Sequence, residues 1–192
     1  GEKVGVILDN CPSWFVCEQA THGLGGVFIP MYEKELKKIW QYIITDASIK
    51  FLFVSNEKIY EQVKEFKGQI PSLKDIFVIF GSGDHSLTDL EKMGKGHPAP
   101  SIKPAWSDLA NIIYTSGTTG PSKGAILSHH YYYYNVISAI YWMRHSANDI
   151  LYSCLPFFHA NASITSIYTA LMAKAAFSMG KRFSLTTFLD EI

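Results

Sequence analysis

The sequence carries no excess of charge of either sign. Among its 192 residues, Lys+Arg and Asp+Glu each number 17, so the formal net charge at pH 7 is +0. A protein that works on nucleic acid usually concentrates positive charge on one face. The balanced composition therefore argues against nucleic acid as the main partner.

Cysteine is scarce and does not form a recognisable pattern. The three cysteines, Cys11, Cys17 and Cys154, are odd in number and lack the short spacings of a metal site. A disulfide framework usually has an even number of cysteines, and a zinc site has short, regular ligand spacings. We expect free thiols, a reducing compartment and a cytoplasmic location, and we predict no metal-ligating residues in this chain.

Long hydrophobic runs are also missing. No stretch reaches the roughly 18 uninterrupted apolar residues that a spanning helix needs, so no membrane span is expected. Gly1–Lys3 lead directly into an apolar run, and no signal peptide is visible. The chain is nevertheless 47% hydrophobic and 18% charged, which is enough to bury a substantial core in one domain or two small ones.

Residues 114–125 read Y-T-S-G-T-T-G-P-S-K-G-A and are the most informative part of the chain. Glycines let a backbone approach an anion closely, while exposed N–H groups, hydroxyls and a lysine donate to phosphate oxygens. An ordinary solvated turn rarely combines so many donors with a lysine. We predict a polyphosphate-binding loop made by Thr115, Ser116, Gly117, Thr118, Thr119, Gly120, Lys123 and Gly124.

This loop differs from the two common nucleotide motifs. In a Walker A loop the lysine directly follows the second glycine and a helix comes next, whereas Lys123 precedes Gly124 and an apolar run follows. A dinucleotide fingerprint needs G-x-G-x-x-G at the opening of a helix. The nearest approach, residues 23–26, stands where a helix is expected to end.

Strand and helix patterns alternate along the chain, which predicts an α/β fold with mainly parallel sheets and flanking helices. Strands are expected at 4–8, 26–29, 50–54, 75–80, 109–114, 125–127, 150–155 and 175–179. Helices are expected at 12–24, 33–46, 57–66, 129–144 and 160–173, with a short one at 87–93 and another starting near 184. The phosphate loop then connects two strands at a sheet end, where α/β folds commonly place ligands.

A change of composition divides the chain. Residues 81–106 are rich in glycine and proline, which is typical of a connector. We predict a βα-repeat half at 1–96, a connector at 97–107, and a second α/β half at 108–192 that carries the phosphate loop.

The motif at 114–124 resembles the signature loop of the adenylate-forming (AMP-binding) enzymes, which include acyl-CoA synthetases. Residues 155–162, L-P-F-F-H-A-N-A, are similar to the next core motif of that family and favour a fatty-acid or carnitine-type CoA ligase. Residues 4–14 and 25–31 resemble the opening of the same catalytic domain, so the likeness extends over nearly the whole chain. One departure is Ser122, where the family usually has proline.

The resemblance implies an ATP-dependent, AMP-forming ligase that activates a carboxylic acid as an acyl-adenylate and transfers it to CoA, with ATP, Mg²⁺ and CoA required. It also implies that Lys123 and His159 are the catalytic residues. Lys123 and the loop would hold the β- and γ-phosphates of ATP, and His159 would line the channel between nucleotide and acid. The chain corresponds to part of the family's N-terminal domain. The family's Tyr-Gly-x-Thr-Glu segment and lid lysine are not in these 192 residues. We therefore expect the isolated chain to be inactive.

Two alternatives remain open. The chain could belong to a catalytically inactive relative that keeps the loop as a phosphate-binding or interaction module. It could also be an unrelated α/β domain with an accidental loop, which the length of the motif disfavours.

Overall fold

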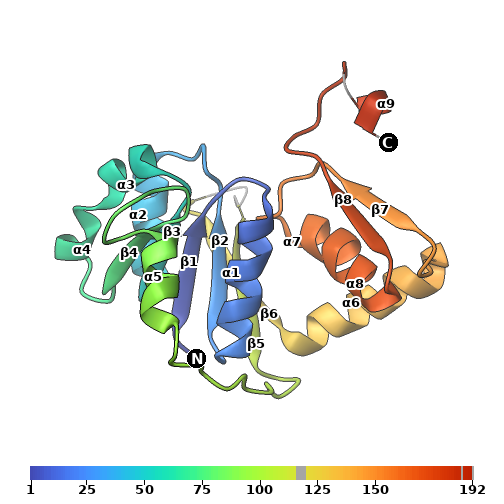
Figure 1. Cartoon of the computed structure of the whole chain (residues 1–192), viewed down its shortest axis with the longest axis horizontal. Helices are drawn as coiled ribbons and strands as arrows, with labels where there is room; N and C mark the ends of the chain where they lie inside the picture. The colour runs from blue at the N-terminus through green and yellow to red at the C-terminus, as the bar shows by residue number, and fades with distance from the viewer. Residues whose placement is uncertain (116–119, 187, 192) are drawn as a thin grey trace.

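A six-stranded sheet forms the centre of the molecule (Figure 1). The computed structural model describes residues 1–115, 120–186 and 188–191. Across the sheet the strand order is β4-β3-β1-β2-β5-β6. The bounds are β1 Lys3–Ile7, β2 Val27–Met31, β3 Phe51–Val54, β4 Asp75–Val78, β5 Leu109–Thr115 and β6 Lys123–Ser128. The first five strands pair in parallel, and β6 returns antiparallel to β5 as the second arm of a hairpin.

Helices cover both faces of this sheet. In Figure 1, α1 (Pro12–Gly23) and α5 (Leu87–Gly94) lie in front of it. Against the opposite face pack α2 (Lys37–Asp46), α3 (Glu57–Val63) and α4 (Phe66–Gln69). In the described part of the chain, no helix is both long enough and apolar enough to cross a membrane.

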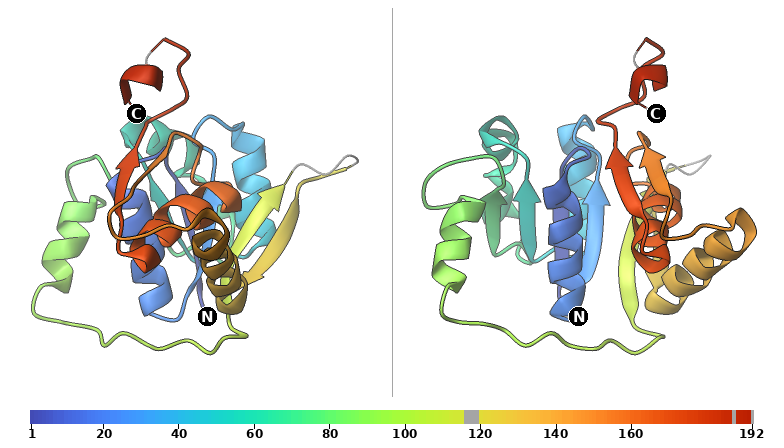
Figure 2. Two further views of the ribbon diagram at one scale, coloured as in Figure 1. Left: turned by 90° about the vertical axis from the view of Figure 1, so that its right-hand side faces the viewer. Right: turned by 45° about the vertical axis from the view of Figure 1, so that its right-hand side comes forward.

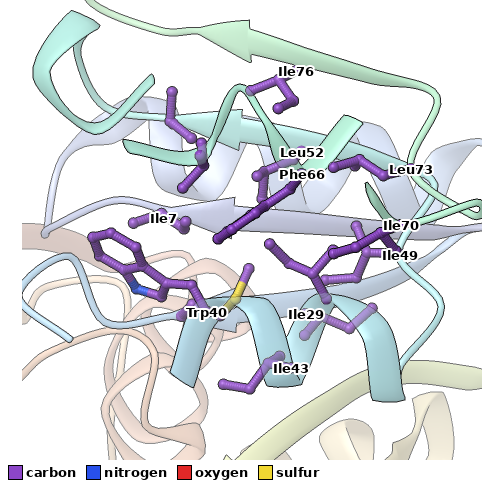
Figure 3. Packing of buried hydrophobic residues seen from close by; sticks show 14 of the residues in the cluster. Ile7, Ile29, Trp40, Ile43, Ile49, Leu52, Phe66, Ile70, Leu73 and Ile76 are labelled. Atoms are coloured by element: carbon purple, nitrogen blue, oxygen red, sulfur yellow. The ribbon is translucent and has the colours of Figure 1, made fainter. Parts of the chain in front are cut away.

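Two hydrophobic clusters lie on opposite faces of the sheet because strand side chains alternate between faces. Ile7 of β1 packs with Trp40 of α2 and Phe66 of α4, as Figure 3 shows. Its neighbour Val6 belongs to the other cluster, with Trp14 of α1. Burial on both faces explains why these strands read as apolar runs rather than as alternating patterns.

The last third of the chain forms a second, smaller layer. Here α6 (His129–Met143) leads into the parallel pair β7 (Ile150–Ser153) and β8 (Ala176–Met179). A helical segment joins them and consists of α7 (Ala160–Ala162), the π-helix η1 (Ser163–Tyr168) and α8 (Thr169–Ala173), while α9 (Phe188–Glu191) follows β8. The Thr169 hydroxyl, at the start of α8, donates to the Ile164 carbonyl of η1 five residues earlier, at 2.9 Å.

The predicted α/β fold with mainly parallel sheets and flanking helices is confirmed. Three details differ. The helix expected at 33–46 begins only at Lys37, the helix expected at 160–173 contains a π-helix, and β6 begins at Lys123, so this lysine starts a strand. The six-stranded sheet also runs across the connector predicted at 97–107, because β5 pairs with β2. The division into two halves stays a prediction about the chain.

Candidate functional site

The two ends of the predicted phosphate loop lie at the carboxyl edge of the sheet. Because β5 runs parallel to β2, its last residue, Thr115, reaches the edge at which β1 to β4 also end. Lys123 opens β6 directly opposite Thr115 in the hairpin register. Figure 2 shows the hairpin at one side of the molecule. Ligands in open α/β sheets commonly bind beyond this edge.

The described residues of the loop are open to solvent. Thr115, Gly120, Lys123 and Gly124 are all exposed. Gly120 has a φ of 89°, in the left-handed region that side chains with a Cβ rarely adopt. The other predicted ligands, Ser116, Gly117, Thr118 and Thr119, lie outside the described residues, and their role stays a prediction.

Gly124 allows two side chains of β5 to pack across the hairpin. A Cβ at this position would come within 2.7 Å of Ile112 Cγ2 and 3.3 Å of the Tyr114 ring. Ile112 and Tyr114 both pack against the core cluster under α2. The glycine therefore brings β6 close to these side chains.

Two tyrosines tie the loop end of the hairpin to α2. The Tyr42 hydroxyl on α2 donates to the Ser122 carbonyl at 3.0 Å, and the Tyr114 hydroxyl on β5 donates to Asp46 Oδ2 at 2.5 Å. Burial, followed by the bond to Asp46, raises the pKa of Tyr114. The hydroxyl thus keeps its proton at neutral pH and remains a donor. These contacts hold the chain on both sides of the undescribed residues.

His159 lies in the turn that follows β7 and precedes α7. Its side chain is exposed, and its ring lies 4.2 Å, centroid to centroid, from that of Phe158. Phe158 in turn packs on Tyr32, which directly follows β2, with 5.0 Å between ring centroids. The predicted catalytic histidine is therefore attached to the same carboxyl edge as the phosphate loop.

One buried amide holds this turn against the large sheet. Asn10, just beyond β1, donates through Nδ2 to the Leu155 carbonyl at 2.9 Å and to the Gly180 carbonyl at 3.2 Å. Its Oδ1 accepts from the Phe157 N–H at 2.9 Å. A single side chain thus joins the carboxyl ends of β1, β7 and β8, and it places the segment before His159.

The sequence profile of the AMP-binding enzyme family matches residues 1–192. The chain belongs to this family. Long chain acyl-CoA synthetase 6 (peroxisomal) of Arabidopsis thaliana is 26% identical over 206 residues, which cover 100% of this chain and 29% of that relative. A crotonobetaine/carnitine–CoA ligase of Escherichia coli is 25% identical over 197 residues, with 100% of this chain and 38% of the relative covered.

Solved AMP-binding enzymes share the fold. The ATP-bound structure of MatB from Rhodopseudomonas palustris superimposes with a TM-score of 0.85 at 26% identity, covering 99% of this chain and 37% of that one. A long-chain-fatty-acid-CoA ligase, FadD1 from Archaeoglobus fulgidus, gives a TM-score of 0.85 at 24% identity, with 96% and 36% covered. The chain thus spans well under half the length of the relatives it matches.

Several residues around the site had no signal in the sequence. Tyr42, Asp46 and Asn10 come from three separate segments, and only the fold brings them to the loop and the His159 turn. The run Tyr131–Tyr134 behaves as helix geometry predicts, since Tyr132 is buried and its neighbours in the run are exposed. His22, which has no distinctive sequence context, proves to contact the base of β5.

Proposed function

We propose that this chain is part of an ATP-dependent, AMP-forming acid–CoA ligase. The observation that carries the proposal is the exposed Lys123, which opens β6 in a glycine- and hydroxyl-rich hairpin at the carboxyl edge of an AMP-binding enzyme fold. The acyl-CoA synthetase and carnitine–CoA ligase relatives support the same reaction class.

The reaction has two balanced steps. A carboxylate oxygen of the acid attacks the α-phosphorus of ATP, the bond to the bridging oxygen breaks, and pyrophosphate leaves with that electron pair. The CoA thiol then attacks the acyl carbon, loses its proton, and displaces AMP. Lys123 and the donors of residues 115–124 would hold the β- and γ-phosphates and stabilise the charge that grows on pyrophosphate.

We propose that Mg²⁺ enters this site bound to the phosphates of ATP. Among the residues that the structure describes, no three His, Cys, Asp or Glu side chains gather into a metal site. Mg²⁺ characteristically keeps several waters and binds through substrate phosphates with few protein ligands. Bound there, it would neutralise charge on the phosphates, while Thr115, Gly120 and Lys123 orient them.

His159 is proposed to line the path between nucleotide and acid. Its exposed ring, in the turn between β7 and α7, is available to a substrate beyond the sheet edge. No general base is needed for the first step, because a carboxylic acid is already ionised near pH 7. We therefore assign His159 a binding role toward the acid and phosphate, and not a proton transfer.

The substrate is proposed to be a fatty or carnitine-type acid. The relatives are named as a long chain acyl-CoA synthetase and a crotonobetaine/carnitine–CoA ligase. The resemblance of residues 155–162 to the family motif favours the same acids. A cytoplasmic location stays a prediction, since one of these relatives is peroxisomal by name.

Acid-dependent exchange between ATP and labelled pyrophosphate tests the proposal. The full-length protein should catalyse exchange with at least one acid of a panel that includes fatty acids and carnitine analogues, and it should form the CoA thioester of that acid. ATP binding without exchange for any acid would instead favour an inactive phosphate-binding relative. The 192-residue chain alone should show no exchange.

Tyr42→Phe should weaken ATP binding while leaving the fold intact. The change deletes the hydroxyl that holds the Ser122 carbonyl but keeps the ring that packs against Tyr114. Losing one such bond corresponds to a rise of about 2- to 12-fold in KM for ATP. The matched control is Tyr60→Phe, a partly buried tyrosine of α3 in the same core cluster. Equal KM values for both variants would contradict the role of Tyr42.

A further inference from the structure

A buried carboxylate joins α1 to the base of the β5–β6 hairpin. Glu18 and Asn111 are both fully buried, with 0% of each exposed. Asn111 Nδ2 donates to Glu18 Oε1 at 2.7 Å. A buried carboxyl group is retained only where polar partners compensate for its loss of water. This contact therefore requires α1 and β5 to stay in one relative position.

His22 holds the other side of the same amide. Because Asn111 Nδ2 faces a carboxylate, Oδ1 is the atom that meets His22 Nε2, at 2.8 Å. His22 Nε2 also lies 3.2 Å from the Ala110 carbonyl. Both of these partners are acceptors, so Nε2 carries the proton and donates to them. Glu18 and His22 stand four residues apart on α1 and thus share one face of the helix.

The paired register between β5 and β2 is shorter than that of the other parallel strand pairs in the sheet. β5 joins the parallel strands through β2, and the register pair is Phe28 with Asn111. A register shift between Leu109 and Asn111 leaves Ala110 without a partner residue in β6. Irregularities of this kind bend strands and are frequent beside active sites. His22 supplies a donor to the carbonyl of that unpaired residue.

We propose that Glu18 and His22 are positioning residues that hold Asn111 from one face of α1 and thereby set the place of β5 and β6, including the phosphate-loop ends Thr115 and Lys123. Thr115 lies four residues beyond Asn111, about 13 Å along the strand. A tilt at Asn111 therefore displaces the loop end. The consequence for ATP rests on the proposed function, whereas the mechanical clamp does not.

The second carboxyl oxygen of Glu18 is surrounded by side chains from other elements. Glu18 Oε2 and the Tyr132 hydroxyl are both buried. Burial, and then the neighbouring Glu18 carboxylate, raise the pKa of Tyr132 and of Tyr168. α1, β5, α6 and η1 thus converge on one carboxyl group, which couples the hairpin to both layers of the molecule.

Hydrogen exchange in the full-length protein tests the clamp without using activity. Asn111→Leu and Glu18→Leu each leave buried polar groups unpaired, so amides of β5 and β6 should exchange at least about tenfold faster. Amides of β1 and β3 should change much less. His22→Leu, a milder variant that retains the Glu18–Asn111 bond, should act in the same direction, and Glu18→Gln should restore slow exchange because its amide oxygen can still accept from Asn111.

Thr21→Val is the matched control. Thr21 is buried on the same helix, and its hydroxyl donates to the Cys17 carbonyl at 2.7 Å, so the change removes a buried hydrogen bond that does not involve β5. It should leave the ratio of hairpin exchange to β1 exchange unchanged. Uniformly faster exchange in every variant, or no difference between Glu18→Leu and Glu18→Gln, would overturn the proposal.

A second readout connects the clamp to ATP. His22→Leu and Glu18→Leu should raise KM for ATP in pyrophosphate exchange about tenfold, with Glu18→Gln rescuing it and Thr21→Val showing no rise. Selective loosening of the hairpin with unchanged KM would overturn the positioning role while leaving the proposed function standing. A wild-type protein that catalyses no pyrophosphate exchange would contradict the proposed function alone. Amide hydrogen exchange would still test the clamp.

Discussion

Lys123→Ala should slow adenylation by about 10²- to 10³-fold, the loss typical of removing one preorganised donor from a developing negative charge. Lys123 stands exposed at the start of β6, opposite Thr115, where its ammonium group can reach a polyphosphate beyond the sheet edge. The measurement is acid-dependent pyrophosphate exchange by the full-length protein. Thioester formation from a supplied acyl-adenylate should suffer much less, because pyrophosphate has already left.

The comparison of the two half-reactions decides the role of this lysine. Equal losses in both steps would show a general effect on the site and contradict the assignment. Lys103→Ala, which removes an exposed lysine from the predicted connector, is the control for loss of a positive charge. It should leave both half-reactions close to those of the wild type.

Glu18→Gln should make the fold more stable at pH 8 and flatten its pH dependence. Burial raises the pKa of Glu18 from 4.5 to about 7, although the bond from Asn111 opposes this shift. A carboxyl group that binds its proton more tightly when folded lowers the free energy of unfolding as the pH rises from about 4.5 to about 7. The shift corresponds to about 3 kcal/mol, and glutamine, which does not ionise, escapes this loss.

Urea denaturation of both proteins at pH 5 and pH 8 measures this effect. The difference between the free energies of unfolding of variant and wild type should grow in favour of the variant by up to about 3 kcal/mol between these pH values. Differences that stay constant from pH 5 to pH 8 would show that Glu18 does not titrate in this range.

The ionisable groups that face Glu18 do not change the direction of this pH dependence. Tyr132 from α6 and Tyr168 from η1 have raised pKa values and keep their protons throughout. His22 has a pKa lowered from 6.5, chiefly by burial, so the stability it contributes is present above 6.5 and lost as the pH falls. Both proteins share that loss, and it cancels in their difference.

Much of the fold was predictable from local patterns. Residues 4–8 and 51–54 are apolar throughout because both faces of the sheet are covered, and their length indicates buried parallel strands. The start of α2 was predicted four residues early. Residues 33–35 are charged and would suit a helix, but residues 33–36 precede α2. There the Leu36 N–H donates to Glu35 Oε1 at 3.0 Å.

The phosphate loop was recognisable because its chemistry is contiguous. Glycines, hydroxyls and Lys123 stand within a dozen residues, so no knowledge of the fold is needed to predict that they act together. The same holds for His159 beside two phenylalanines. Their roles remain proposals, and the experiments on Lys123 address the first of them.

The sequence by itself determined the alternation of strands and helices, the hydrophobic runs of the core and the loop that marks the family, since each depends on neighbours along the chain. Only the tertiary structure decided what surrounds that loop. Asn10, Tyr42 and Glu18 make contacts across 145, 80 and 93 residues, respectively. Hydrogen bonds at such separations depend on strand order and helix placement, which no local pattern contains.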